Sequence, residues 1–423
     1  MAPKLTFKLS LRELIFAFFI VLLPFSLFAE YHTSWNEIAY CDEILCIICI
    51  IYTLYFSFKK GIKGNDLTLL ILLIVCSLIT FVGNFVNKLI TSPLPIIVDF
   101  ICLVKIFIVF IVYKQVAEYD KKKRMIQYLA PLSKLFISIS TLCGFISLFF
   151  NIGMTGKDVR YGINEYFFVF NNSSRYGLIV ACCFLILHFS NSSPKEEMLA
   201  YKIMTAFDML LTTKGVVYII LVVYIVLSFI WRRKKETKFT TGNTLILSIC
   251  IMIASTLQIN TYLRDEESPR MVLLRYGFKT ANKYLPFGSG FATYGSDMAA
   301  RYYSVLYKQY GFTKRYGLNQ IYGAFLNDCY LGMVFGEFGY IGAIIFFIMV
   351  GFVFVPINKI TISKGIKILS LSIFIALIIS AIGTAIIKSS IGVFVMCVLG
   401  MVCGYDTAFK KAENSAKKSI EEA

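Results

Sequence analysis

The sequence has few of the residues that metal centres and soluble surfaces require. Only two of its 423 residues are histidines, and 16% are charged, whereas soluble domains carry about 25% charged residues. His32 and His188 stand apart from any group of Cys, Asp or Glu, so we expect no metal site. The sequence also contains no phosphate-binding loop, dinucleotide fingerprint or serine nucleophile elbow. We therefore expect no cofactor.

Cysteines in a polar setting are equally scarce. Most of the twelve cysteines lie inside apolar runs, including the C-x-x-C of Cys46 and Cys49 in "ILCIICIIYTLYF". A metal or redox site needs accessible thiolates and partner ligands. We interpret these cysteines as small apolar residues and expect no disulfides.

Apolar residues dominate the chain. They make up 58% of it, and the mean hydropathy is +0.73, against about 45–50% apolar residues in soluble domains. The net charge of +17 could indicate a nucleic-acid partner. However, the Lys and Arg residues cluster at the ends of apolar segments, as the positive-inside rule describes, and no nucleic-acid motif is visible. We predict a membrane protein that binds no nucleic acid.

Twelve apolar segments are long enough to be candidate membrane spans, which need about 20 residues each. They are residues 13–29, 40–58, 66–86, 95–115, 129–150, 167–190, 197–212, 215–231, 243–260, 332–355, 366–384 and 389–405. The seventh is short and carries Lys202 and Asp208. We interpret the first segment as a retained helix rather than a signal peptide, because its apolar run is long and lacks a clean cleavage site. The predicted fold is an all-α integral membrane protein of about 12 transmembrane helices.

Charges alternate between successive loops. Lys and Arg residues mark the start of the chain, the region around Lys59 to Lys63, Lys121 to Arg124, Arg232 to Lys235, and the C-terminus. The positive-inside rule places these on the cytoplasmic side, with both termini. The acidic turn 30–43, the loop 151–166 and the long loop 261–331 then lie outside. Lys88 and Lys388, near outer ends of spans, are expected to reach the interface by snorkelling.

The loop 261–331 is rich in Tyr and Phe, so we predict that it is folded. Loops longer than about 12–15 residues are usually functional or disordered. The stripe Met271, Leu274, Phe278 and Ala281 predicts a helix over 268–284, with Pro269 suited to its start. A second helix is predicted over 295–309. No internal repeat indicates a transporter built from two halves.

Several cations are candidates for binding an anion, and diphosphate is the natural one because the planar guanidinium donates hydrogen bonds in pairs. They are Arg160, Arg175, Lys214, Arg270, Arg275 and Arg301. For the loop arginines the alternative is a solvated surface. For Arg175, at the outer part of a span, it is an interhelical salt bridge or snorkelling. Lys105 is also intramembrane, and the sequence does not identify its partner.

The stretch "PFGSGFATYGS", from Pro286, could expose backbone N–H groups to an anion or a sugar, since its glycines permit sharp turns. Tyr303 and other aromatic residues after it offer flat faces for sugars. Asp328 could be a general base or a helix N-cap, and the two roles are compatible. Glu337 is expected to bond inside the bundle, and we include it among the candidate substrate-binding residues.

Together, Arg270, "PFGSGFATYGS", "YYSVLYKQYG" and "NDCYLGMVFGEFGYIG" closely resemble the bacterial O-antigen polymerase and ligase superfamily. The nearest likeness is to polymerases of capsular or O-antigen repeat units, over residues 265–345. The resemblance implies a GT-C-like architecture in the bacterial inner membrane. It also implies metal-independent, inverting transfer of a growing glycan from undecaprenyl diphosphate to a hydroxyl of the next lipid-linked repeat unit, on the extracytoplasmic face.

The resemblance also suggests roles for single residues. Asp328 stands where ligases of the superfamily carry a His, nine residues before Glu337, which argues against a ligase. Lys214 stands in the place of a ligase Arg. Arg270 is the best match to the loop Arg that contacts diphosphate, and Arg275 is the second. A chain-length regulator and a flippase are implied partners. The alternatives are a ligase that transfers glycan to lipid A core, or a flippase for lipid-linked oligosaccharides.

Overall fold

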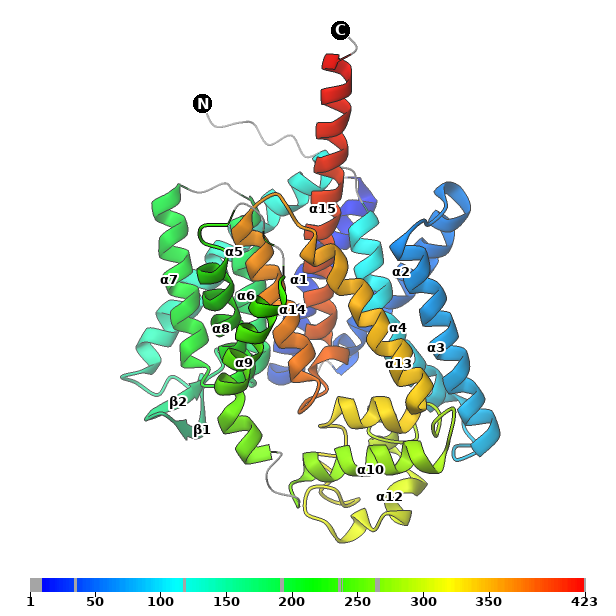
Figure 1. Ribbon diagram of the computed structural model, residues 1–423. Helices are drawn as coiled ribbons and strands as arrows, with labels where there is room; N and C mark the ends of the chain where they lie inside the picture. Colours follow the sequence, from blue (N-terminus) through cyan, green and yellow to red (C-terminus); the bar gives the residue numbers. More distant parts are fainter. Residues whose placement is uncertain are drawn as a thin grey trace.

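The computed structural model describes residues 10–33, 36–116, 119–190, 194–234, 237, 239–262 and 267–421, and nearly all of its regular structure is helical (Figure 1). In chain order the elements are α1 (Leu11–His32), η1 (Asn36–Tyr40), α2 (Cys41–Lys60), α3 (Asn65–Asn87), α4 (Pro93–Gln115), α5 (Tyr119–Ser147), β1 (Thr155–Arg160), β2 (Ile163–Tyr166), α6 (Ser173–Ser190), α7 (Lys195–Leu211), α8 (Gly215–Ile230), α9 (Thr241–Tyr262), α10 (Pro269–Lys283), α11 (Asp297–Arg301), α12 (Val305–Gln309), η2 (Phe312–Lys314), α13 (Tyr330–Asn358), α14 (Lys364–Ser380), η3 (Ile386–Lys388) and α15 (Ser390–Glu421).

Eight helices in the described part of the chain are long and apolar enough to cross a membrane: α1 to α6, α13 and α15. Helix α8 and the first part of α9 are shorter apolar helices. The predicted class, an all-α multi-pass membrane protein, is therefore confirmed. A helix lies at each of the twelve predicted segments, although α7 and α14 have only 17 residues each.

The two ends of the bundle differ in what they carry. The start of α1 and the end of α15 lie at one end, and α10 to α12 lie at the other (Figure 1). The start of α1 and the end of α15 therefore lie opposite α10 to α12, an arrangement that agrees with the charge pattern. Which side faces the cytoplasm stays a prediction from that pattern.

Helices α4, α6 and α15 form the centre of the bundle. Most residues of α4 and α6 are buried, as are most of those from Ser390 to Lys410 of α15. Gly400 and Gly404 of α15 lie directly against the backbone of α4. A Cβ atom on Gly400 would be 2.6 Å from the carbonyl oxygen of Phe110, and one on Gly404 would be 2.1 Å from that of Lys114. Small residues four apart allow this backbone contact, so α4 and α15 pack as a tight pair.

Two helix bounds differ from the prediction. The sixth predicted segment begins at residue 167, but α6 begins at Ser173, because Phe168 and Asn171 adopt positive φ angles of 53° and 49° that no helix accommodates. Helix α13 is interrupted at Gly339 (φ 65°, ψ −173°). The part before Gly339 lies beside α10 and the part after it runs through the bundle (Figure 1).

Residues 267–329, which we call the loop domain, fold around a small core of their own. Leu273, Tyr294, Tyr307 and Phe312 are buried together there. The helix predicted over 268–284 is confirmed as α10, which starts at Pro269 after the N-cap Ser268. The single helix predicted over 295–309 is wrong. Two short helices, α11 and α12, replace it because Tyr303 has a positive φ of 46° between them.

Residues 286–296, which we call the glycine loop, insert between α3, α4 and α13. Every backbone N–H from Ser289 to Gly295 donates to another part of the protein. In that order, the acceptors are Gly336 O, Glu337 O, Asn84 Oδ1, Asp99 Oδ2, Glu337 Oε1 for two successive residues, and Tyr307 OH. The expectation that these N–H groups receive an anion or a sugar is therefore wrong: the glycines serve close packing instead.

A β-hairpin follows α5, where the sequence analysis placed only a loop. Strands β1 and β2 pair antiparallel, with Arg160 opposite Ile163. The two residues between them, Tyr161 and Gly162, have φ angles of 55° and 79°, which fits a tight hairpin turn of the primed type. Asn-Gly and Asp-Gly are the strong sequence signals for this turn. The Tyr-Gly found here is not one of them, so the sequence did not predict a hairpin.

Docking of the glycine loop is testable at Gly288. A Cβ atom there would lie 2.3 Å from Gly339 N and 2.5 Å from Glu337 O, on a backbone with φ +76°. We expect Gly288→Ala to expose the loop domain to protease and to lower the thermal melting temperature in detergent. The matched control is Gly311→Ala, which has φ +70° but no atom within 4 Å. It should cost only the backbone strain, about 1 kcal/mol, and equal effects of the two would contradict this packing.

Candidate functional site

The strongest predicted pair of site residues is brought together at the junction of the loop domain and the bundle. Arg270, the second residue of α10, donates from its NH2 group to Asp328 Oδ2 over 2.8 Å. Their side chains are 19% and 28% exposed, so both are accessible. The turn after α14 lies alongside, with Gly383 next to the Arg270 side chain. Two contacts hold that turn: Leu331 N donates to Ala381 O, and Cys329 Sγ donates to Ile382 O.

Asp328 is not the N-cap of α13. Cys329 is the N-cap, and its sulfur accepts from Gly332 N. The N-cap role considered for Asp328 is therefore wrong, and its carboxylate is left to face Arg270. Burial raises the pKa of Asp328 above its ordinary value, and the Arg270 cation opposes part of that rise. A partly exposed carboxylate with a raised pKa can serve as a proton acceptor.

A second ion pair joins the loop domain to the bundle. Lys388 Nζ lies 3.0 Å from Asp297 Oδ2, and Asn327 Nδ2 donates to Asp297 Oδ1. Burial disfavours ionised Asp297, but Lys388, Asn327 and Lys105 more than offset it, so its pKa lies below the ordinary value. Lys388 itself is 3% exposed, so the expectation that it snorkels to the interface is wrong.

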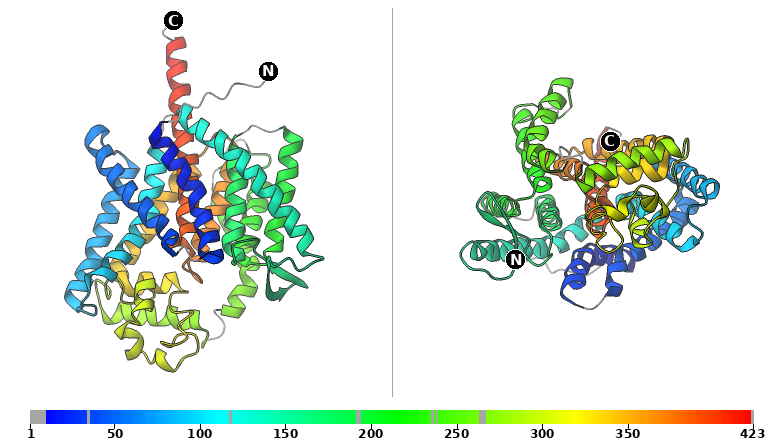
Figure 2. Two further views of the ribbon diagram at one scale, coloured as in Figure 1. Left: turned by 180° about the vertical axis from the view of Figure 1, so that it is seen from behind. Right: turned by 90° about the horizontal axis from the view of Figure 1, so that it is seen from below.

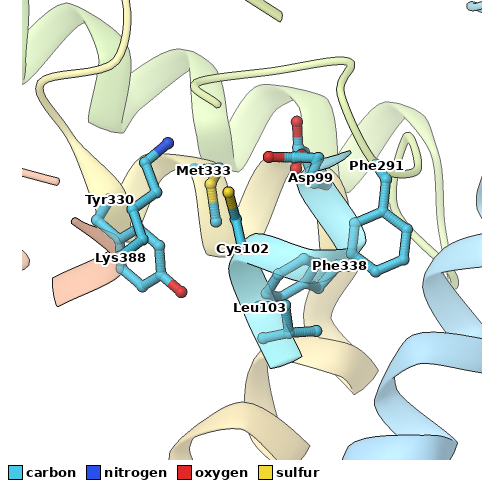
Figure 3. A pocket seen from close by; sticks show the side chains of 9 residues that line it. Asp99, Cys102, Leu103, Phe291, Tyr330, Met333, Phe338 and Lys388 are labelled. Atoms are coloured by element: carbon cyan, nitrogen blue, oxygen red, sulfur yellow. The ribbon is translucent and has the colours of Figure 1, made fainter. Parts of the chain in front are cut away.

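Lys388 also lines a small enclosed cavity of about 10 Å³ with Asp99, Tyr330 and Glu337, which is enough room for about one water molecule. Figure 3 shows Lys388 and Tyr330 on one side of this cavity and Asp99 with Phe291 on the other. Its size excludes a sugar or a diphosphate. We therefore interpret the cavity as part of the contact between the loop domain and the bundle.

Glu337 is completely buried and holds the glycine loop. Its Oε1 accepts from Thr293 N, Tyr294 N and Ser296 Oγ at 2.8 to 2.9 Å. The expectation that Glu337 bonds inside the bundle is confirmed. The three donors to its Oε1 all belong to the glycine loop, so Glu337 positions the loop domain.

A separate group of predicted residues lies where α6 and α8 begin, beside the β-hairpin. Lys214 Nζ is 2.5 Å from Glu165 Oε2, and Ser173 Oγ donates to Glu165 Oε1 over 2.6 Å. Arg175 follows on α6 and is half-buried. In the part of the chain that the structure describes, its guanidinium has no hydrogen-bond or ion-pair partner. Arg160, at the end of β1, is half-buried near Tyr218 of α8.

The remaining predicted residues lie on the loop domain. Arg275 is exposed and stacks on Tyr276, 5.9 Å from its ring centre, and Arg301 is exposed at the end of α11. Tyr303 is 5% exposed and donates its hydroxyl to Leu318 O over 3.2 Å. Its ring is therefore part of the domain's own core rather than an open platform.

The structure thus places the predicted residues in two groups on different elements, and α14 lies between them. Helix α14 packs on α6 and α8, and the turn at its end meets Arg270. Seen from below, the loop domain covers one side of the bundle, and the hairpin with α6 to α9 occupies the other (Figure 2).

Sequence reasoning missed the acidic partners in these groups: Glu165, Asp297, Asp99 and the pair Asp42 and Glu43. Lys105, whose partner was unidentified, lies 2.5 Å from Asp42 Oδ2 and 2.9 Å from Glu43 Oε1. One signal was available for Lys105. A lysine inside a span is usually paired, and the acidic turn 30–43, predicted on the outer side, offered carboxylates for that pair.

Comparison with known proteins adds no family to this description. No family model matches the chain, and no curated protein matches it.

The role of Glu337 can be tested with two substitutions. Glu337→Gln keeps one oxygen to accept from Thr293, Tyr294 and Ser296, so we expect a melting temperature close to that of the native chain. Glu337→Ala leaves three buried donors without an acceptor and should cost about 3 kcal/mol or more. Thermal unfolding in detergent measures both, and equal destabilisation by Gln and Ala would contradict the hydrogen-bonding role.

Proposed function

We propose that the chain is a repeat-unit polymerase, a metal-independent inverting glycosyltransferase that uses lipid-diphosphate-linked glycans in capsule or O-antigen synthesis. The observation that carries the proposal is the accessible Arg270–Asp328 pair. It places a cation for a departing diphosphate beside a carboxylate that can accept a proton. The likeness of residues 265–345 to the O-antigen polymerase and ligase superfamily supports the same assignment.

In the proposed reaction, an acceptor hydroxyl oxygen attacks the anomeric carbon of the growing glycan. A carbon–oxygen bond forms there with inversion, while the bond to the diphosphate oxygen breaks and its electron pair leaves with undecaprenyl diphosphate. The hydroxyl proton passes to Asp328. The guanidinium of Arg270 stabilises the departing charge, and a donor of this kind contributes about 2.7–4 kcal/mol in comparable sites.

The ion pair also offers a way to prime the base. Arg270 lowers the pKa of Asp328 against the rise caused by burial. A diphosphate that takes hydrogen bonds from Arg270 draws that cation away from the carboxylate. The pKa of Asp328 then rises further, so the base becomes stronger when the donor is bound.

The second group supplies one more available cation. Lys214 is neutralised by Glu165, whereas Arg175 has no partner among the described residues and is free to hold an anion. We assign Arg175 to the diphosphate of the second lipid-linked substrate, because Arg270 holds the departing one, and Lys214 with Glu165 to positioning. Arg160, Arg275 and Arg301 are assigned to contacts with the glycan or phosphate farther from the reacting carbon.

The architecture proposed with this function has all twelve helices crossing the membrane of a bacterium, in a GT-C-like arrangement. The loop domain is extracytoplasmic and both termini are cytoplasmic. A ligase is less well supported, since Asp328 occupies the position where ligases carry a His. A flippase needs no folded domain with a carboxylate at its base.

Polymerisation in proteoliposomes tests the proposal directly. Purified lipid-diphosphate repeat units with EDTA should give a glycan ladder with the native chain. Asp328→Asn should reduce the rate about 10²–10⁴-fold, and Arg270→Ala about 10²–10³-fold. The matched control is Arg315→Ala, which removes another Arg–carboxylate pair on the loop domain, with Glu267, and should leave the ladder intact.

Other outcomes identify what is wrong. Passage of the lipid-linked unit across the bilayer without a ladder would replace the polymerase by a transporter. Transfer to lipid A core alone would indicate the ligase. A ladder that survives Asp328→Asn would keep the enzyme and remove Asp328 as its base.

The pH dependence of polymerisation gives an independent test. A general base works when ionised, so the rate should fall as the pH drops through the raised pKa of Asp328. Arg270→Gln removes the cation that opposes the rise in the free enzyme, so the acid limb of the residual kcat/KM should move to higher pH. The control Arg315→Gln should leave the acid limb where it is in the native chain. An acid limb that also stays in place in Arg270→Gln would exclude Asp328 as the titrating group.

A further inference from the structure

An apolar groove of about 310 Å³ lies between α1, α5 and α6. Its walls include α1 from Ile20 to Phe28 and α5 from Leu129 to Phe136, and residues 168–170 also line it. Eight residues of helix span about 12 Å, so the groove is long and narrow. Phenylalanine rings from α1, α5, α15 and residues 168–170 give it an aromatic lining, whereas α6 contributes Ile179, Cys183 and Ile186.

The α6 wall of the groove leads to Arg175. Ile179, Cys183 and Ile186 line the groove from α6, at spacings of four and three residues that place them on one helix face. Arg175 lies four residues before Ile179 on that face, one turn nearer the end of the bundle that carries the loop domain. The groove is therefore apolar along its length. A half-buried cation, without a partner among the described residues, lies one helical turn beyond Ile179.

We propose that this groove holds the hydrocarbon chain of the lipid-diphosphate substrate, with its diphosphate on Arg175. This inference rests on the proposed function and adds a lipid-chain site to it. A single narrow groove fits one chain, whereas a phospholipid has two. The flat aromatic walls suit the methyl-branched, unsaturated units of a polyprenyl chain.

Packing, rather than removal of apolar surface from water, sets the affinity here. A chain that leaves the bilayer for the groove exchanges one apolar environment for another. Discrimination must therefore come from the fit of the chain to the walls and from the cation of Arg175. A side chain that fills the groove should reduce binding of a long-chain lipid and spare a short one.

The experiment measures binding of two synthetic probes to the full-length chain in nanodiscs: a long-chain polyprenyl diphosphate and a geranyl diphosphate. Leu132→Trp fills the groove from α5. Leu135→Trp is its matched control, because Leu135 is on the same helix, is similarly exposed (58% against 51%) and lies outside the groove. Cys183→Phe is a second filling variant, in case the first alters folding. Arg175→Gln tests the cation.

We expect both filling variants to weaken long-chain binding about tenfold, with geranyl diphosphate unchanged, and Arg175→Gln to weaken both probes. Leu135→Trp should bind like the native chain. Equal long-chain affinity in the native chain and both filling variants would overturn the groove as the site. Displacement of the probe by a modest excess of phosphatidylglycerol would overturn its selectivity. Binding is read without turnover, so failure of polymerisation leaves this test intact.

Discussion

The structure depends on satisfying the peptide groups of the glycine loop where no water reaches them. An unpaired backbone N–H in such a place costs several kcal/mol, and this loop buries seven in succession. The acceptors come from α3, α4, α12 and α13, which are far apart in the sequence. The interruption of α13 at Gly339 follows from the same constraint, because the loop backbone passes too close for any side chain there. Once the loop is seated, α10 and the start of α13 are fixed, and with them Arg270 and Asp328.

Pairing of buried charges decides which groups remain for chemistry. Lys105, Lys214 and Lys388 each lie against a carboxylate. Breaking the fully buried Lys105–Asp42 pair leaves an uncompensated charge at a cost of about 3–5 kcal/mol. These lysines hold helices and the loop domain together. The Arg270–Asp328 pair differs from Lys105–Asp42 because both of its side chains remain partly exposed, so a ligand can compete for the bond. Arg175 differs again, because its guanidinium has no ion-pair partner among the residues that the structure describes.

The sequence alone predicted the helical membrane class, the twelve helix positions, helix α10 and the folded state of the long loop. Those features follow from local hydropathy and periodicity, which are properties of neighbouring residues. It also selected Arg270 and Asp328, which do meet. It could not place Glu165 on Lys214, or Asp42 on Lys105, because those contacts join segments tens of residues apart. The glycine loop was misjudged for a related reason. Glycines mark a close approach of the backbone, but nothing local says whether the partner is a ligand or a helix of the same chain.

The position of Glu337 in the chain has a consequence for the order of synthesis. The glycine loop is made about forty residues before the carboxylate that accepts three of its hydrogen bonds. Helices α3 and α4, which supply Asn84 and Asp99, are already made when the loop is synthesised. Until α13 has been synthesised, the loop can therefore form only part of its final hydrogen bonds, among them those to α3 and α4. Folding of the loop domain is therefore completed only after α13 has been synthesised, late in the production of the chain.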